Sequence, residues 1–114
     1  MDIENLKEEI RKLEEKGIPV IVEGKKDKRA MESLGLRNIL MLDGRPLFDI
    51  CESIQAKEVA ILTDLDTEGR KLYSSIYKTL VRRGIKVDNK LRLMLFKAKL
   101  SHIEGLDSYL QKQA

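Results

Sequence analysis

Apolar residues recur at two different spacings along the chain, and the alternation between these spacings predicts the order of its elements. The first 17 residues place an apolar side chain at every third or fourth position, which is typical of an amphipathic helix. The apolar positions are Ile3, Leu6, Ile10 and Leu13, and Gly17 follows as a residue that ends helices. Residues 1–17 are therefore predicted to form one N-terminal amphipathic helix.

Short continuous apolar runs follow, separated by segments with helical periodicity. Runs of this kind are typical of strands that are buried on both faces of a sheet. The predicted strands cover residues 18–22, 39–42, 59–62 and 91–96, and the predicted helices between them cover 26–34, 47–55 and 68–83. A further short helix is predicted over 102–112, where Gly105 weakens the pattern.

Strands that alternate with helices predict an α/β fold. Parallel strands need crossover connections, and right-handed crossovers place helices over both faces of the sheet. We therefore expect a three-layer α/β/α sandwich built on a four-stranded parallel sheet. Residues 18–100 would form the sheet with its helices, and the N-terminal helix (1–17) and the C-terminal tail or short helix (101–114) would belong to the same single domain.

Composition agrees with one domain that has its own hydrophobic core. Hydrophobic residues make up 42% and charged residues 36% of the 114 residues, and this composition lacks the polar bias of a disordered chain.

No apolar run approaches the roughly 20 residues that span a bilayer, so we expect a cytoplasmic protein with no membrane partner. Cys51 is the single cysteine, which excludes an intramolecular disulfide. The net charge of +3 suits contact with a polyanion such as nucleic acid.

Acidic residues follow two of the predicted strands. Glu23 comes directly after the first strand, Asp64 and Asp66 follow the third, and Glu68 lies at the start of the next helix. Neighbouring strands lie about 4.8 Å apart, so side-by-side placement of these two strands would bring three carboxylates to one edge. Carboxylates at such a spacing repel one another unless a cation neutralises them. Mg²⁺ is the natural candidate, with Mn²⁺ as a substitute, because these ions prefer hard oxygen ligands.

A simpler explanation exists for each acid taken alone. For Asp66 or Glu68 alone, capping of the helix that follows is as good an explanation as metal binding. Glu23 alone would be an ordinary solvated residue at the end of a strand. The combination of Glu-Gly after one strand and Asp-Leu-Asp-Thr-Glu-Gly after another favours a metal site over these separate explanations.

Two motifs resemble those of the Toprim family. Residues 22–27, Val-Glu-Gly-Lys-Lys-Asp, are similar to the first Toprim motif of bacterial-type primases. Residues 63–69, Thr-Asp-Leu-Asp-Thr-Glu-Gly, are similar to the second motif of type IA topoisomerases. The resemblance extends over about residues 18–100 and implies the Toprim fold, a parallel sheet with strand order 2-1-3-4. That order makes the first and third strands neighbours.

The resemblance also implies roles for the acidic residues. By motif position, Glu23 matches the general acid or base of the family, and Asp64 and Asp66 match its Mg²⁺ ligands. Glu68 matches a further acid of the topoisomerases, so the implied metal set is Asp64, Asp66, Glu23 and Glu68. Asp27 matches a recurrent acidic position. The sequence departs from the topoisomerase pattern at Arg70, where a second glutamate would stand, and a basic residue there favours phosphate contact.

Basic residues flank both motifs and the turn after the second predicted strand. The candidates for nucleic-acid binding are Lys25, Lys26, Arg45, Arg70 and Lys71. Arg45 is the best of them, because Asp43-Gly44 before it would let the backbone approach a ligand. For any one of these side chains, an ordinary solvated face is an equally good explanation.

These features predict a Mg²⁺-dependent phosphodiesterase that cleaves RNA or DNA, similar in scale to small stand-alone Toprim proteins and to the Toprim part of ribosomal RNA maturases. The alternative is a non-catalytic module that binds metal and nucleic acid within a larger processing complex. Haloacid dehalogenase-like phosphatases fit less well, because they typically place Gly-Thr or a similar pair directly after the second Asp of a motif in the first strand, whereas Thr67-Glu68 follows Asp66 in the third. Receiver domains fit less well because they need an acidic pair after the first strand and a lysine after a fifth. Tyr73 and Tyr77 share one helix face and are expected to pack rather than to stack on bases.

Overall fold

The computed structural model describes residues 3–98, 103–105 and 110. Its elements are α1 (Ile3–Lys16), β1 (Val20–Val22), α2 (Lys25–Ser33), β2 (Ile39–Met41), α3 (Leu47–Ser53), β3 (Glu58–Ile61), α4 (Thr67–Arg82), β4 (Lys86–Asp88), α5 (Lys90–Lys97) and a 3₁₀ turn, η1 (Ile103–Gly105). Most of the helix predicted over 102–112 lies outside the described residues.

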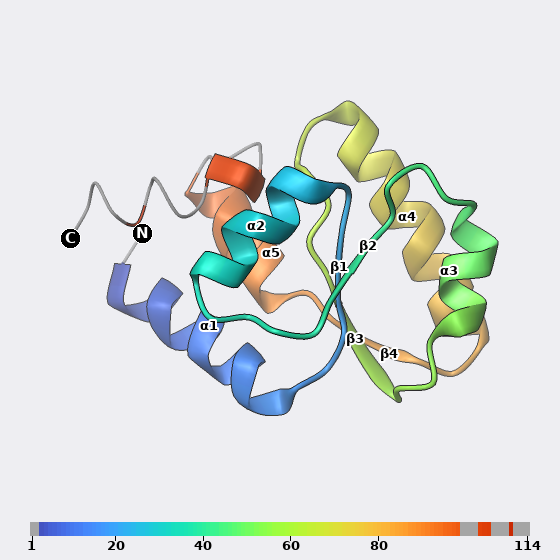
Figure 1. Ribbon diagram of the computed structural model, residues 1–114, viewed down its shortest axis with the longest axis horizontal. Coiled ribbons are helices and arrows are strands. Elements are labelled where there is room, and N and C mark those ends of the chain that lie inside the picture. The colour runs from blue at the N-terminus through green and yellow to red at the C-terminus, as the bar shows by residue number, and fades with distance from the viewer. Residues whose placement is uncertain (1–2, 99–102, 106–109, 111–114) are drawn as a thin grey trace.

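The four strands form one parallel sheet in the order β2-β1-β3-β4, as predicted (Figure 1). The first strand pairs with β2 on one side and with β3 on the other, with Val20 opposite Ile39 and Ala60. The strand β4 pairs with the outer side of β3. Two segments that are distant in the sequence, β1 and β3, are therefore direct neighbours at the centre of the sheet.

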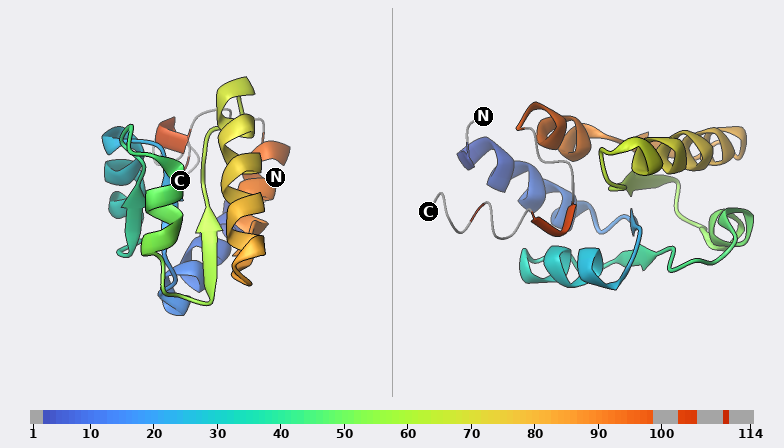
Figure 2. Two further views of the ribbon diagram at one scale, coloured as in Figure 1. Left: turned by 90° about the vertical axis from the view of Figure 1, so that its right-hand side faces the viewer. Right: turned by 90° about the horizontal axis from the view of Figure 1, so that it is seen from above.

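Alternating side chains of the central strands bury two separate hydrophobic clusters, one on each face of the sheet. Val20 and Val22 pack with apolar residues of α1, α2 and α5, whereas Ile21 packs with those of α3 and α4. Figures 1 and 2 show the same division, with α1, α2 and α5 on one side of the sheet and α3 and α4 on the other. The fold is the α/β/α sandwich expected from continuous apolar strands.

The prediction for the fourth strand was wrong. Residues 91–96 lie in helix α5, and the fourth strand is the short segment Lys86–Asp88. In the helix, Leu91 and Leu95 are buried at a spacing of four residues, while Leu93 and Phe96 are 52% and 55% exposed. The true strand lies at the edge of the sheet and has charged residues on both sides of its single apolar residue, so no apolar run marks it.

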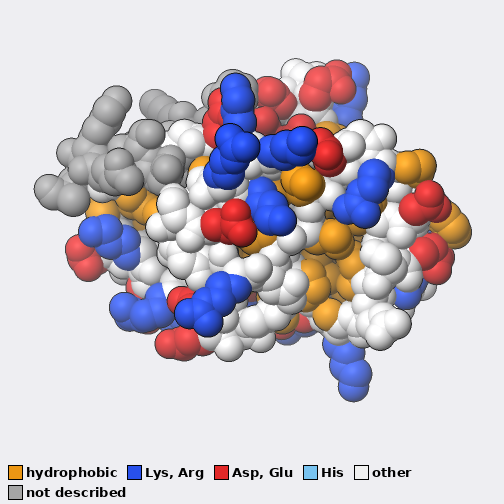
Figure 3. Space-filling model, in the orientation of Figure 1, with side chains coloured by type: hydrophobic (Ala, Val, Ile, Leu, Met, Phe, Trp, Pro, Cys, Tyr) orange, Lys and Arg blue, Asp and Glu red, His pale blue; other side chains and the backbone are white. Residues whose placement is uncertain are grey.

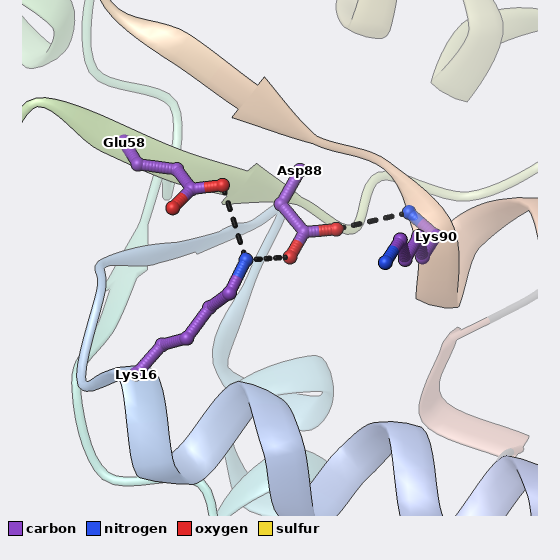
Figure 4. A network of polar contacts seen from close by, with 4 residues as sticks. All are labelled: Lys16, Glu58, Asp88 and Lys90. Carbon is purple, nitrogen blue, oxygen red and sulfur yellow. Dashed lines mark hydrogen bonds and ion pairs between the residues drawn. The ribbon is translucent and has the colours of Figure 1, made fainter.

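An ion-pair cluster joins α1 to the last two strands (Figure 4). The Lys16 Nζ atom lies 2.7 Å from Asp88 Oδ2 and 3.1 Å from Glu58 Oε2, and the Lys90 backbone N–H donates to Asp88 Oδ1. Burial alone would raise the pKa of Asp88, but the hydrogen bonds from Lys16 and Lys90 outweigh burial and lower it. The side chain of Asp88 is only 6% exposed, so this carboxylate depends on its partners.

We predict that Lys16→Met lowers the free energy of unfolding by about 1 kcal/mol at pH 7, because Asp88 loses a charged donor. The value is small because Lys16 itself is 41% exposed and its ion pairs are screened by solvent. Urea unfolding followed by circular dichroism measures it, with Lys12→Met on the same helix as the matched control.

The same variant has a predicted pH dependence. A carboxylate with a lowered pKa in the folded state stabilises the fold above its unfolded pKa, about 3.9 for aspartate, and this contribution disappears as the pH falls through the folded value. The stability difference between wild type and Lys16→Met should therefore be full at pH 7 and should shrink below about pH 4. A difference that stayed constant down to pH 3 would contradict this assignment.

Candidate functional site

Two loops meet at the carboxyl edge of the sheet, one after β1 and one after β3. Because the two strands are neighbours, the half-buried Glu23 lies against the second loop. The Asp64 backbone N–H donates a hydrogen bond to Glu23 Oε2 at 2.6 Å. The two motifs that are 41 residues apart in the chain are thus joined directly.

In the first loop, Asp27 organises the start of α2. The Gly24 backbone N–H donates to Asp27 Oδ2 at 3.0 Å, and Asp27 is only 8% exposed. Burial raises the pKa of Asp27, the hydrogen bond from Gly24 opposes that rise, and the nearby charge of Asp64 adds to it. Asp27 therefore both caps the helix and adds a carboxylate to the site.

In the second loop, Asp66 caps α4. The Gly69 backbone N–H donates to Asp66 Oδ1 at 2.8 Å, and the fully buried Thr63 hydroxyl donates to the Gly69 carbonyl oxygen at the same distance. A Cβ atom on Gly69 would lie 2.0 Å from the Asp64 carbonyl oxygen, so only glycine allows this approach. Capping, one of the two explanations for Asp66, is therefore correct for one oxygen of its carboxylate.

Four carboxylates of the two loops lie within electrostatic reach of one another. Burial raises the pKa of Glu23, the hydrogen bond from Asp64 N–H opposes this, and the charges of Asp64, Asp27 and Asp66 raise it further. Among the described residues, no group of three or more His, Cys, Asp or Glu side chains is arranged to hold a metal ion by itself. Mg²⁺ usually binds through one or two carboxylates, waters and substrate phosphates, so the donor set of these loops fits that ion.

Glu68, the fourth residue of the predicted metal set, is placed differently from the other three. Its side chain is 81% exposed and pairs with Lys71, with Oε1 and Nζ 3.8 Å apart. It is absent from the charges that raise the pKa of Glu23. The structure thus groups Glu68 with Lys71 on the outer surface of α4.

The predicted nucleic-acid-binding residues surround the two loops. Lys25 and Lys26 are exposed in the first turn of α2. Arg45 follows a turn in which Asp43 and Gly44 have φ of 46° and 76°, and its Nη2 donates to the Met41 carbonyl oxygen at 2.7 Å. Figure 3, which has the orientation of Figure 1, shows Lys and Arg side chains gathered in the upper part of the view, with acidic side chains among them.

Arg70 and Lys71 complete the predicted set at the start of α4. Arg70 donates from Nε to the Leu65 carbonyl oxygen at 2.9 Å, and its guanidinium carbon lies 5.7 Å from the ring centroid of Phe96. Arg70 is therefore held against the second loop, whereas Lys71 is directed toward Glu68.

Arg92, which the sequence did not single out, reaches the same loop from α5. It donates from Nε to the Thr63 carbonyl oxygen at 3.2 Å and from Nη2 to the Asp64 carbonyl oxygen at 3.0 Å. Burial lowers its pKa, although an arginine stays charged in proteins. The prediction missed Arg92 because it assigned residues 91–96 to a strand. Leu91 and Leu95, four residues apart, were the signal in the sequence for a helix that carries Arg92.

Comparison with known proteins agrees with this fold. A family model described as Toprim domain matches residues 19–93. A UPF0292 protein of Methanocaldococcus jannaschii is 36% identical, with 90% of this chain and 85% of that protein covered. A UPF0292 protein of Pyrococcus abyssi is 37% identical, with 86% and 76% covered. A solved structure of a protein from Aquifex aeolicus superposes with a TM-score of 0.81 at 32% identity, covering 88% of this chain and 96% of that chain.

A parallel 2-1-3-4 sheet with acidic loops after its first and third strands defines a Toprim domain. The chain belongs to the Toprim family and, within it, groups with the UPF0292 proteins. This family is one of metal-dependent nucleic-acid processing, and its domains generally bind divalent metals such as Mg²⁺. No helix of the described part of the chain is long and apolar enough to cross a membrane.

We predict that Gly69→Ala destabilises the protein by about 2–4 kcal/mol, because the new methyl group must displace the Asp64 backbone. Thermal unfolding by calorimetry measures the loss. Gly24→Ala is the matched control, since a Cβ atom at that motif glycine would meet no atom within 4 Å. Equal stabilities of the two variants would show that the second loop adjusts freely.

Proposed function

We propose that this protein is a Mg²⁺-dependent nuclease that cleaves phosphodiester bonds of RNA or DNA, with Mn²⁺ able to replace Mg²⁺. The observation that carries the proposal is the hydrogen bond from Asp64 N–H to Glu23 Oε2, which joins the first motif to the second. It joins Glu23, proposed here for proton transfer, to the loop that contains Asp64 and Asp66, proposed here for metal binding. Membership in a family of metal-dependent nucleic-acid processing proteins supports the same conclusion.

The proposed division of roles is the one that the motif positions imply. Asp64, Asp66 and Glu23 would hold the ion, and the exposed Glu68 would be a further ligand. When bound, the ion would supply stabilisation of the charge that develops on the phosphate oxygens. Glu23 would exchange a proton with the attacking water or the leaving oxygen. Because Oε2 is held by the Asp64 N–H, Oε1 is the atom for this exchange.

The basic residues around the loops would hold the phosphates on either side of the cleaved bond. Lys25 and Lys26 follow Glu23 closely at the start of α2, and Arg45 follows the turn after the neighbouring strand β2. Arg70 and Lys71 would perform the same task beside Asp66. One nitrogen of Arg45 already bonds to the Met41 carbonyl oxygen, which orients the remaining N–H groups of the guanidinium.

We predict cleavage of labelled RNA or DNA that requires Mg²⁺ and stops in EDTA. Removing the acid or base should cost about 10²-fold to 10⁴-fold in rate, so Glu23→Gln should fall by this amount. Asp64→Asn should lose at least about 100-fold, because a metal ligand is removed. The measurement is single-turnover cleavage of single-stranded, duplex and structured substrates of both nucleic acids.

Matched controls come from α3, where Glu52→Gln and Asp49→Asn remove exposed acids remote in sequence from both motifs. These controls should cleave at the wild-type rate. If no substrate is cut but one is retained in the presence of Mg²⁺, the chain is a non-catalytic module that binds metal and nucleic acid within a larger processing complex. If the control variants lose as much as Glu23→Gln, the carboxylate site is not the origin of the activity.

Removing a phosphate contact should reduce the salt dependence of binding by a fixed amount. We predict that Lys25→Ala and Lys26→Ala each lower the slope of log binding constant against log salt by about 0.7 to 0.9. The measurement is fluorescence anisotropy at several NaCl concentrations in EDTA. Lys7→Ala on α1, a helix rich in glutamate, is the control and should leave the slope unchanged.

A further inference from the structure

A surface of aromatic rings and guanidinium groups extends from the second loop across α4 and α5. The Tyr73 and Tyr77 rings stack with centroids 5.8 Å apart and planes inclined by 20°. The guanidinium carbon of Arg92 lies 4.3 Å from the Tyr73 centroid, and that of Arg70 lies 5.7 Å from the Phe96 centroid. These five residues are called the ring surface below.

The outer rings of this surface are open to solvent. Tyr77 is 42% exposed and Phe96 is 55% exposed, whereas Tyr73 packs partly into the cluster beneath α4. The expected packing role of the tyrosines is therefore met by Tyr73. Tyr77 and Phe96 leave much of their rings outside the core, and each lies against another ring or a guanidinium group rather than singly on the surface.

The ring surface is connected to the carboxylate site by its two arginines. Arg92 lies over Tyr73 and at the same time donates to the Asp64 carbonyl oxygen. Arg70 follows Gly69 directly and donates to the Leu65 carbonyl oxygen in the same loop. A ligand that lies on these rings would therefore extend directly to the two acidic loops.

The charge around the rings is strongly positive. Helix α5 contains Lys90, Arg92 and Lys97 and no acidic residue, and the only acid of α4 is Glu68, against four basic residues. Helix α1, in contrast, carries five glutamates and four basic residues. A polyanion would therefore be attracted to α4 and α5 in particular, and its phosphates would meet side chains that flank the rings.

We infer that the ring surface binds unpaired nucleotides, with bases stacked on Tyr77 and Phe96 and phosphates held by Arg70, Arg92 and Lys97. Aromatic rings that alternate with basic side chains are the common means of binding single strands, because each base has a face for stacking. In a duplex these faces are covered by neighbouring bases. The inference rests on the proposed function and deepens it, since it makes a single strand or an unpaired segment the substrate of the carboxylate site.

The test compares three fluorescein-labelled DNAs: an oligothymidylate about 12 nucleotides long, an abasic strand with the same phosphates, and a blunt duplex of equal length. Binding is measured by anisotropy with the full chain in EDTA, so that no strand is cut. Wild type should prefer oligothymidylate over both other ligands. Tyr77→Ala and Phe96→Ala should each weaken binding of oligothymidylate by about fivefold to a hundredfold, and Phe96→Tyr should retain it.

The abasic strand separates stacking from charge. Tyr77→Ala and Phe96→Ala should bind it as wild type does, because only base contacts are removed. Phe48→Ala, which removes a 67% exposed ring on α3, is the matched control and should bind oligothymidylate normally. The inference is overturned if the ring variants bind oligothymidylate like wild type, if they lose equal affinity for the abasic strand, or if sedimentation shows that Phe96→Ala dissociates a dimer that these rings hold together.

Failure of this inference and failure of the proposed nuclease give different results. Ring-dependent binding without any Mg²⁺-dependent cleavage would support the single-strand site and reject the nuclease. Cleavage that depends on Glu23 but is indifferent to both rings would support the nuclease and reject the single-strand site. Thermal unfolding of each variant shows that the exposed substitutions leave the fold intact.

Discussion

The direct pairing of β1 with β3 is the constraint from which the rest of the site follows. Neither strand is long, and the acidic residues that follow them are 41 positions apart in the chain. Parallel pairing places both carboxyl ends at one edge, and the Asp64 N–H then bonds to Glu23. Crossover helices on both faces are needed for this topology, and the two buried clusters that they form hold the strands in register.

Like charges close together at this edge repel one another and lower the stability of the fold. Several contacts hold the backbone of the second loop in place against this repulsion. Three groups fix its backbone: the Thr63 hydroxyl bonds to the Gly69 carbonyl, Asp66 caps α4, and Gly69 allows the close approach of α4 to Asp64. The guanidinium groups of Arg70 and Arg92 add positive charge near the carboxylates, since both bond to carbonyl oxygens of the loop. The positive charge of both arginines is thereby placed against the backbone of the second loop.

Most of the architecture could be predicted from the sequence because its central strands are buried on both faces. Val20–Val22 and Val59–Leu62 are continuous apolar runs, which are typical of strands in a parallel sheet covered on both faces. The edge strand β4 gives no such signal: Val87 is its one apolar residue, so the more apolar segment after it was taken for the strand. That error also concealed Arg92. The meeting of Glu23 with Asp64 was predictable from motif and strand order, whereas the outward position of Glu68 depends on a local ion pair with Lys71.

Helix α5 belongs to the hydrophobic core, and through Arg92 it also contributes to the electrostatic potential at the site. Its guanidinium group donates to two carbonyl oxygens of the loop. The positive charge offsets the partial negative charges of these oxygens, which would otherwise add to the negative potential of the carboxylates. The same side chain lies on the Tyr73 ring. A movement of α5 would therefore alter the potential felt by a cation at the sheet edge even if no carboxylate moved. The electrostatic potential at this edge therefore depends in part on a helix that contributes no carboxylate to it.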